Sequence, residues 1–350
     1  MIWLTWRQFR GAAATMSAVL VVLAAVLVLT GPRLASDYAD GIADCAQSDC
    51  TRFFDRFFDE YQLPFLAVTL VVLVLPALIG LFWGAPLITR ELEAGTHLLV
   101  WNQSITRTRW LAVKLTLPGV AAVAAAGLCG LAATWWAAPL DRSAAAGFTL
   151  MDPLVFGARG IVPMVYAAFA FVLGVTVGML VRRTLPAMAL TLALFAAVQL
   201  VVPLTVRPHL MPPVSGTFEL GRGNIDLFGL SEQGPPLVIL DSAIPGHPGA
   251  WVLSSRLVDP SGRPLGAHGA AVNVPVPTSS GPCSRAAQSE PGSIMEGCLA
   301  EVNRLGYRQA AIYQPFERFW PFQWIETGVY ALLTLGLTGL CFRWVRRRLS

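Results

Sequence analysis

Six long apolar segments constrain the fold of this chain more than any other feature of its sequence. They lie at about 12–30, 63–82, 110–138, 160–181, 185–206 and 321–342. A helix needs roughly 20 predominantly apolar residues to cross the hydrocarbon core of a bilayer, and each segment reaches about that length. Only 13% of the residues are charged, against about 25% in soluble proteins. The sequence therefore predicts an all-α polytopic membrane protein with six transmembrane helices.

Basic residues indicate how these helices are oriented. They cluster at Arg7 and Arg10, at 90–114, at Arg182 and Arg183, and at 343–348. Lys and Arg are enriched on the cytoplasmic side of membranes, and six spans place all of these clusters on one face. We therefore expect both termini to be cytoplasmic, and we expect 32–62 and 207–319 to be extracytoplasmic.

The segment 207–319 interrupts the helical pattern before the sixth span. It is rich in Gly, Pro and Ser, with β-like runs at 237–240 and 270–276 and a more helical stretch at 294–313. Such punctuation over this length favours a folded domain with long loops over a linker. The expected organisation is 1–206 with five spans, a large extracytoplasmic α+β insertion at 207–319, and 320–350 with the sixth span and a basic cytoplasmic tail.

Two cysteine pairs fall in the segments that we expect outside. Cys45 and Cys50 lie in the predicted extracytoplasmic loop 32–62, and Cys283 and Cys298 lie in the predicted domain. Disulfides form and persist in oxidising compartments, so both pairs are expected to be bonded. A metal site is the competing interpretation, but these spacings match no standard zinc motif.

The polar segment 84–109 joins the second and third spans on the expected cytoplasmic side. It is either a solvated connector or a contact for a soluble protein. The one lysine of the chain, Lys114, is followed by Leu115, whereas a phosphate-binding loop requires Gly-Lys-Ser/Thr. If ATP drives this protein, another chain must bind ATP and magnesium, so we expect no cofactor here.

Few polar side chains occur inside the predicted spans, and these can mark a path for substrate or ions. The candidates are Glu326, Arg159 and Gln199. Glu326 lies about one turn into the sixth span. It is either a carboxylate near the outer interface, which reaches water or pairs with Arg159 or a helix end, or a group that gates or contacts substrate. The scarcity of deep acidic residues argues against a proton- or sodium-coupled transporter.

Two sequence motifs carry a resemblance to a known family. The first reads Arg90-Glu91-x-Glu93-x-Gly95-Thr96, then a short apolar run, then Gln103-Ser104-x-Thr106-Arg107-x-Arg109 leading into Lys114. It resembles the permease subunits of type-2 ABC exporters, and it looks especially like actinobacterial ABC transporter permeases. The second motif, from Gln314 to Glu326 at the entry to the sixth span, resembles the same subgroup.

The resemblance implies a membrane subunit without catalytic activity in a bacterial plasma membrane. Part of 84–109 would be a coupling helix seated in a cytoplasmic ABC ATPase. The implied coupling residues are Arg90, Glu91, Glu93, Gly95, Thr96, Arg107 and Arg109. Glu91 and Glu93 would meet basic residues of the ATPase, and Arg107 and Arg109 would hold phosphates of membrane lipid.

The resemblance also implies a moving second span and a second permease subunit. Pro76 and Gly80 are candidate hinge points of that span. The two permeases would form a path at their interface along the second and fifth spans. Separately from the resemblance, the Ala-, Gly- and Leu-rich spans fit the export of a hydrophobic or amphipathic substrate, and they fit ordinary helix packing equally well.

A membrane-anchored sensor or assembly protein is the alternative function. In that case 207–319 would bind a ligand or partner outside, and 84–109 would dock a cytoplasmic protein. Nucleic acid is not an expected partner, because the arginines lie at the ends of apolar segments, where membrane topology explains them.

Overall fold

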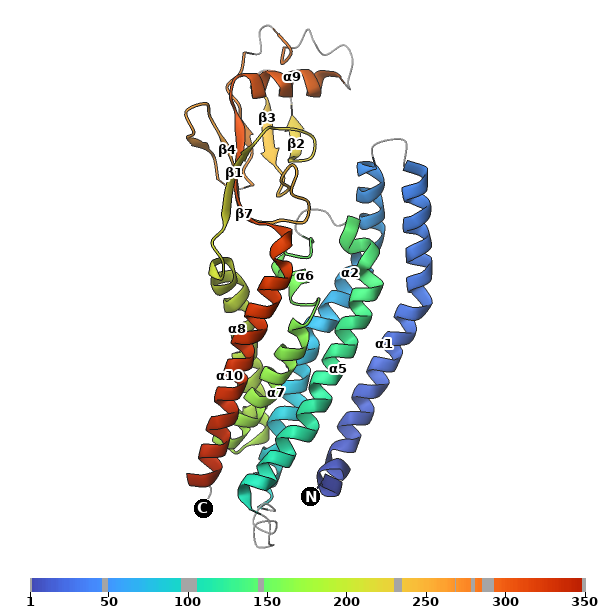
Figure 1. The fold of residues 1–350 in the computed structure, drawn as a ribbon, viewed down its shortest axis with the longest axis vertical. Coiled ribbons are helices and arrows are strands. Elements are labelled where there is room, and N and C mark those ends of the chain that lie inside the picture. Colours follow the sequence, from blue (N-terminus) through green and yellow to red (C-terminus); the bar gives the residue numbers. More distant parts are fainter. Residues whose placement is uncertain are drawn as a thin grey trace. The chain divides into compact units, whose positions relative to one another are not determined.

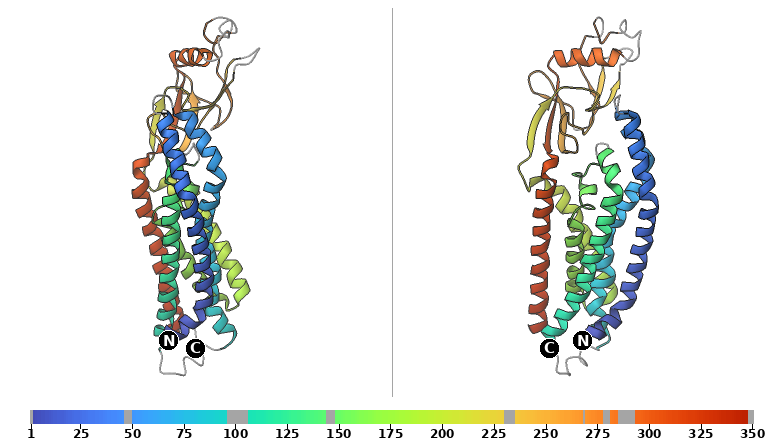
Figure 2. Two further views of the ribbon diagram at one scale, coloured as in Figure 1. Left: turned by 90° about the vertical axis from the view of Figure 1, so that its right-hand side faces the viewer. Right: turned by 45° about the vertical axis from the view of Figure 1, so that its right-hand side comes forward.

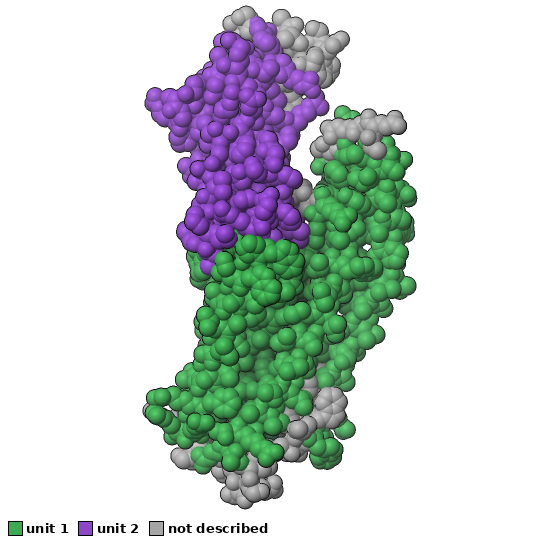
Figure 3. All heavy atoms as spheres, viewed as in Figure 1, with its two compact units in different colours: residues 1–145, 153–207, 320–350 green, residues 146–152, 208–319 purple. Residues whose placement is uncertain are grey.

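The computed structural model describes residues 2–45, 50–95, 106–143, 148–229, 235–267, 269–277, 281–284 and 293–347 (Figure 1). The chain divides into two compact units, coloured separately in Figure 3. Unit 1 comprises Met1–Ala145, Pro153–Arg207 and Trp320–Ser350. Unit 2 comprises Ala146–Asp152 and Pro208–Phe319.

Unit 1 is a bundle of long helices. These are α1 (Ile2–Cys45), α2 (Thr51–Ile79), α5 (Arg107–Ser143), α7 (Val162–Val181), α8 (Thr184–Val201) and α10 (Phe319–Arg347). They run side by side in all views, and both chain ends lie at the same end of the bundle (Figures 1 and 2). Within the described ranges, six helical segments are long and apolar enough to cross a membrane, which confirms the predicted number.

Short elements extend or connect these helices. They are the π-helical turn η1 (Gly80–Gly84), α3 (Ala85–Glu93), α6 (Pro153–Phe156), the π-helical turn η2 (Val202–Val206) and the 3-10 turn η3 (Arg207–His209). Because η1 and α3 follow α2 without a break, one continuous candidate span runs from Arg52 to Glu93.

The core of unit 1 is organised around α7. Sixteen of its 20 residues are buried, and it contacts α2, η1, α3, α5 and α8. A helix that is apolar all round is stable only when neighbours or lipid surround it. The apolar windows of α1, α8 and α10 are mostly exposed, so these helices provide the surface that faces lipid or another chain.

The segment 32–62, which we expected to be a loop, is helical over most of its length. The 44 residues of α1 correspond to about 66 Å, whereas the hydrocarbon core is about 30 Å thick. The acidic residues end the apolar span without ending the helix. The disulfide Cys45–Cys50 joins the tips of α1 and α2, and the rings of Tyr38 and Phe57 pack 5.5 Å apart between them.

Unit 2 contains two antiparallel sheets in the part that the structure describes. In the first, β1 (Val214–Phe218) pairs with β7 (Arg308–Gln314), β7 with β4 (Trp251–Val258), and β4 with β5 (Pro264–Leu265). In the second, β3 (Leu237–Leu240) lies between β2 (Ile225–Gly229) and β6 (Val272–Asn273). Helix α9 (Ser293–Arg304) completes the unit.

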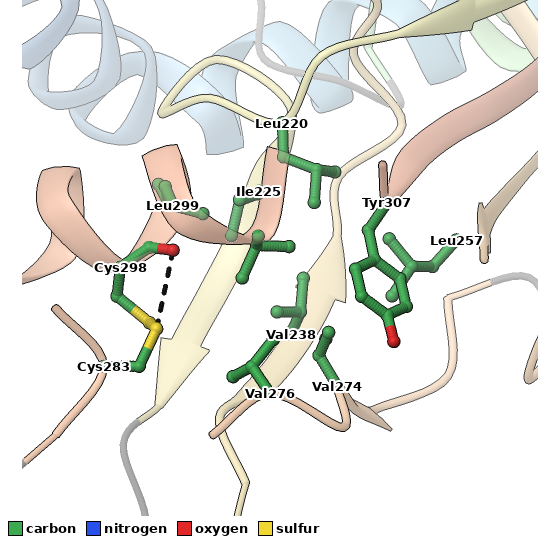
Figure 4. Close-up of a cluster of buried hydrophobic side chains, with 11 residues drawn as sticks. Leu220, Ile225, Val238, Leu257, Val274, Val276, Cys283, Cys298, Leu299 and Tyr307 are labelled. Atoms are coloured by element: carbon green, nitrogen blue, oxygen red, sulfur yellow. Dashed lines mark hydrogen bonds between the residues drawn. A yellow bond between two sulfur atoms is a disulfide. The ribbon is translucent and has the colours of Figure 1, made fainter. Parts of the chain in front are cut away.

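The main core of unit 2 packs α9 against both sheets (Figure 4). The disulfide Cys283–Cys298 is buried at its edge, which confirms the second predicted pair. The predicted helical stretch 294–313 is helical only in its first half, because residues 308–314 form the central strand β7. Alternate side chains of β7 are buried, and this period-two pattern is typical of a strand with one covered face.

Candidate functional site

Glycines allow η1 and α3 to pack directly against α7. A Cβ added at Gly80 would lie 2.7 Å from the Ala170 carbonyl oxygen, and one at Gly178 would lie 2.8 Å from the Ala85 carbonyl oxygen. A Cβ at Gly84 would overlap the carbonyl group of Phe171. Small residues permit such close backbone approach between membrane helices. The region after α2 is therefore fixed closely to the central helix of the bundle.

A buried ion pair attaches α3 to α5. The Lys114 ammonium lies 2.5 Å from Oε1 of Glu91, and both side chains are at most 10% exposed. Lys114 also donates to the carbonyl oxygen of Leu87 at 3.3 Å, and its Nζ lies 5.2 Å from the centre of the Trp110 ring. Burying a charge is costly unless it is paired and hydrogen-bonded, so this geometry holds the two helices in register.

A second contact attaches the end of α3 to the start of α8. Oε1 of Glu93 accepts from the Thr184 backbone N–H at 2.8 Å, and Oε2 accepts from the Thr184 hydroxyl at 2.5 Å. A carboxylate is favourable at a helix N-terminus because unsatisfied N–H groups and the helix dipole both attract it. Arg182 takes a left-handed conformation with φ 59° in the tight turn before α8.

Both carboxylates that we expected to meet the ATPase have partners within the chain. Glu91 is buried against Lys114, whereas Glu93 remains exposed while it accepts from Thr184. Their contact with an ATPase stays a prediction. Arg90 is exposed on α3, Arg107 is half-buried and Arg109 is exposed in the first turn of α5. Gly95 has φ +65° directly after α3, and Thr96 lies outside the described residues.

The candidate hinge residues lie next to a local change in helix type. Pro76 is in the last turn of α2, and Gly80 begins the π-helical turn η1. A π-helical turn interrupts the regular hydrogen-bond ladder of an α-helix and frequently marks a functional position. The sequence predicted Pro76 and Gly80 as hinge points, but it contained no signal for the π-helical turn itself.

A buried polar cluster joins three spans elsewhere in unit 1. Nε and Nη2 of Arg207 lie 2.8 and 3.0 Å from the two carboxylate oxygens of Glu326. The Tyr166 hydroxyl donates to the same carboxylate, and Arg207 also donates to Tyr166 and to the Pro153 carbonyl oxygen. Arg207 and Glu326 are each 1% exposed. Of the partners that we considered for Glu326, the structure shows a helix end, because Arg207 lies in the last turn of the candidate span Thr184–His209, and Glu326 neither reaches bulk water nor pairs with Arg159.

Arg159 has a different partner, Asp141 of α5. Nε of Arg159 lies 3.1 Å from Oδ2 of Asp141, and the guanidinium packs 5.2 Å from the centre of the Phe65 ring. We did not predict Asp141, Tyr166 or Arg207 as site residues, because their partners come from distant segments of the sequence.

Gln323 fixes α10 to the start of α7. Its Oε1 accepts from the backbone N–H groups of Ile161 and Val162, both at 3.1 Å. Its Nε2 donates to the carbonyl oxygens of Phe156 and Arg159. One amide thus satisfies backbone groups that a helix terminus leaves open. Its place in the motif from Gln314 to Glu326 was the available sequence signal.

A cavity of about 410 Å³ lies beside this polar cluster. We call it the α2–α8 cavity. Its apolar walls come from α2, α6, α8 and η2, with Tyr166, Gln199 and Arg207 as its polar residues. The Tyr330 hydroxyl donates to Oε1 of Gln199 at 3.0 Å. Gln199, which we predicted as an intramembrane polar group, thus lines a space large enough for a small ligand.

One comparison with known proteins identifies the family. A family model described as ABC-2 membrane transporter related matches residues 17–207. The chain belongs to this family. No curated protein and no solved structure matches it with significance.

Membership makes the chain an ABC-2 type permease, as the two motifs predicted. Permeases of the ABC-2 family are membrane components of transporters, and they typically work with an ATPase subunit. The matched region contains α3, Lys114 and the α8 wall of the cavity, and it ends at Arg207. The contacts that Gln323 and Glu326 make therefore connect the family region to a helix beyond it.

Proposed function

We propose that this ABC-2 permease couples a separate cytoplasmic ATPase to the efflux of a hydrophobic or amphipathic substrate. The observation that carries the proposal is the attachment of α3. This short helix continues from α2 and is bonded to α5 through Glu91 and to α8 through Glu93. A force applied to α3 would therefore reach three candidate spans together.

The ATPase would contact the exposed part of this region. Arg90, Glu93 and Ala94 are exposed on and just after α3, whereas Glu91 is buried and positions the helix. Arg107 and Arg109 would meet the phosphates of anionic lipid at the membrane surface. A hinge at Pro76 and Gly80, where α2 passes into the π-helical turn η1, would allow the outer part of α2 to respond when α3 moves.

Orientation and assembly complete the proposal. Both termini and α3 would be cytoplasmic, unit 2 and the α1–α2 tip would be extracytoplasmic, and the membrane would be a bacterial plasma membrane. The positive-inside distribution of arginine supports this orientation. A second permease subunit would complete the translocation path.

The proposal is tested by charge reversal at Arg90 with a matched control. We expect Arg90→Glu to lower the amount of ATPase that co-purifies with the permease at least severalfold. The substrate-dependent rate of ATP hydrolysis by the complex should fall by a similar factor. Arg256→Glu changes an equally exposed arginine on β4 of unit 2 and should alter neither quantity. Equal ATPase binding by both variants would contradict a docking role for α3.

A sensor or assembly protein is the second candidate, and the independent core and disulfide of unit 2 favour it. It predicts that no ATPase requires this chain for activity. A purified complex in which ATP hydrolysis depends on the permease would exclude that candidate.

A further inference from the structure

The polar lining of the α2–α8 cavity restricts the chemistry of its ligand. The guanidinium of Arg207 is neutralised by Glu326, and its nitrogens donate to Glu326, Tyr166 and Pro153. An anionic group would find no uncompensated positive charge here, and it would have to lie beside the Glu326 carboxylate. Desolvating a charge without a partner is strongly unfavourable. The cavity therefore selects against anionic groups.

Gln199 favours a ligand that presents a neutral hydrogen-bond acceptor. Its Oε1 is occupied by the Tyr330 hydroxyl, and in the described part of the chain its Nε2 has no hydrogen-bond acceptor. An amide nitrogen has two N–H donors, and a buried donor gains from an acceptor. A neutral carbonyl oxygen would satisfy Gln199 without adding charge.

The mouth of the cavity indicates where the ligand enters. Leu200 is 63% exposed and Leu204 is 67% exposed, and both line the cavity. They lie on the candidate span Thr184–His209, whose apolar window is mostly exposed. On a candidate membrane span such an apolar surface faces lipid or another chain, so the opening lies on an apolar face of the bundle.

We propose that the α2–α8 cavity binds the hydrocarbon chain of an amphiphile and the uncharged ester or amide linkage of that chain. The chain would occupy the apolar walls, and Nε2 of Gln199 would donate to the linkage carbonyl. The source is either a resident bilayer lipid or the transported amphiphile. Only the second source rests on the proposed exporter function.

The experiment uses the full chain in phospholipid nanodiscs, without the ATPase. The probes are two phospholipids with the same photoreactive hydrocarbon chain, attached to glycerol through an ester in one and through an ether in the other. We expect the ester probe to label cavity residues roughly three- to tenfold more than the ether probe, which is the value of one neutral hydrogen bond. Equal labelling of the cavity by both probes would overturn the role of Gln199.

Variants on α8 separate the cavity from the general lipid surface. Gln199→Leu should reduce labelling by the ester probe to the ether level and leave the ether probe unchanged. Ala196→Phe fills the cavity and should reduce both. Ala193→Phe alters another exposed alanine of α8 that does not line the cavity, and it should reduce neither. Equal losses in the two Phe variants would overturn the proposal. The ratio of ester-probe to ether-probe labelling is measured on the unsubstituted protein, so this part of the test holds even if a variant fails to fold.

A second arm with the ATPase distinguishes the two sources. Labelling that falls on addition of ATP identifies the transported amphiphile, and labelling that ATP leaves unchanged identifies a resident lipid. If the cavity is labelled but no ATP hydrolysis depends on the permease, only the exporter function is contradicted. If ATP hydrolysis depends on the permease but the cavity is not labelled, only the cavity assignment is contradicted.

Discussion

Lys114 is held by a carboxylate, a backbone carbonyl and an indole ring that come from two helices. The sequence indicated no partner for Lys114, and the residue is 2% exposed. Arg207 and Glu326 form a second buried pair, 119 residues apart in sequence. In both pairs the charges act on the chain's own structure.

Removing one member of the α3–α5 pair should destabilise the folded protein strongly. Lys114→Met removes the cation that is paired with the buried Glu91 carboxylate, and breaking such a buried pair typically costs about 3–5 kcal/mol of unfolding free energy. Combining it with Glu91→Leu should recover most of this loss, because neither charge is then buried. Thermal or denaturant unfolding in detergent measures the stability loss of the single variant and its recovery in the double variant.

The control for this prediction is the exposed pair of Arg222 and Glu296, whose side chains are 58% and 66% exposed. Arg222→Met should change stability by less than about 1 kcal/mol, since solvent screens such pairs. Similar effects of Arg222→Met and Lys114→Met would show that burial does not determine the contribution of Lys114.

At the scale of elements, the central feature is the passage from α2 through η1 into α3. Gly80, Gly84, Gly174 and Gly178 bring this segment onto α7 at backbone distance. Gly174 and Gly178 are four residues apart, a spacing that is typical of close helix packing, but it does not indicate which element lies against them. A spacing identifies a helix face, whereas its partner depends on how the whole bundle assembles.

A single methyl group at this contact should be poorly tolerated. Gly84→Ala would force a Cβ into the Phe171 carbonyl group and should cost about 1–3 kcal/mol. Gly339→Ala is the matched control, because nothing lies within 4 Å of its added Cβ on α10. There the better helix propensity of alanine should leave stability equal or slightly higher. Thermal midpoints in detergent compare the two variants, and equal midpoints would contradict the packing argument.

The sequence predicted elements that depend on neighbouring residues, and it did not predict elements that depend on pairing with distant residues. Six apolar segments and both disulfides are confirmed. The helices through 32–62 were missed, because hydropathy marks the end of a membrane span and not the end of a helix. The strand at 308–314 was missed, because its register with β1 and β4 involves residues at least 50 positions away. The motif in 84–109 predicted an ATPase-coupling region, which stays a prediction, and it did not predict the internal pairing of Glu91 and Glu93.

The disulfides give a prediction at the level of these elements. Thiol titration of the unfolded chain should find two reactive cysteines without reductant, Cys129 and Cys341, and six with it. Substituting both Cys283 and Cys298 by Ala opens a loop of 15 residues and should cost unit 2 about 3 kcal/mol. Faster limited proteolysis within unit 2 would report this loss. Four or more thiols without reductant would contradict the disulfides.

At the scale of the whole molecule, the chain combines a helical bundle with a separate α+β body. The family match covers residues 17–207, and within unit 2 it includes the short segment Ala146–Asp152 but none of Pro208–Phe319. Coupling to an ATPase is therefore proposed from the bundle, and unit 2 has no part in that proposal.

Orientation can be measured with one pair of matched variants. Ala94 follows α3 and Ala267 follows β5, and both are exposed. A membrane-impermeant maleimide applied to intact cells should label Ala267→Cys and not Ala94→Cys, whereas both should react after permeabilisation. Cys129 and Cys341 are buried and give little background. Labelling of Ala94→Cys alone in intact cells would reverse the proposed topology.

The burial of Lys114 has a further consequence for experiments on this protein. The chain has one side-chain amine, and an acylating reagent must reach it between α3 and α5. Acylation of that amine therefore requires the two helices to separate. If an ATPase pulls on α3 during its cycle, the rate of acylation at Lys114 reports how often α3 and α5 separate, and no label needs to be introduced by mutation.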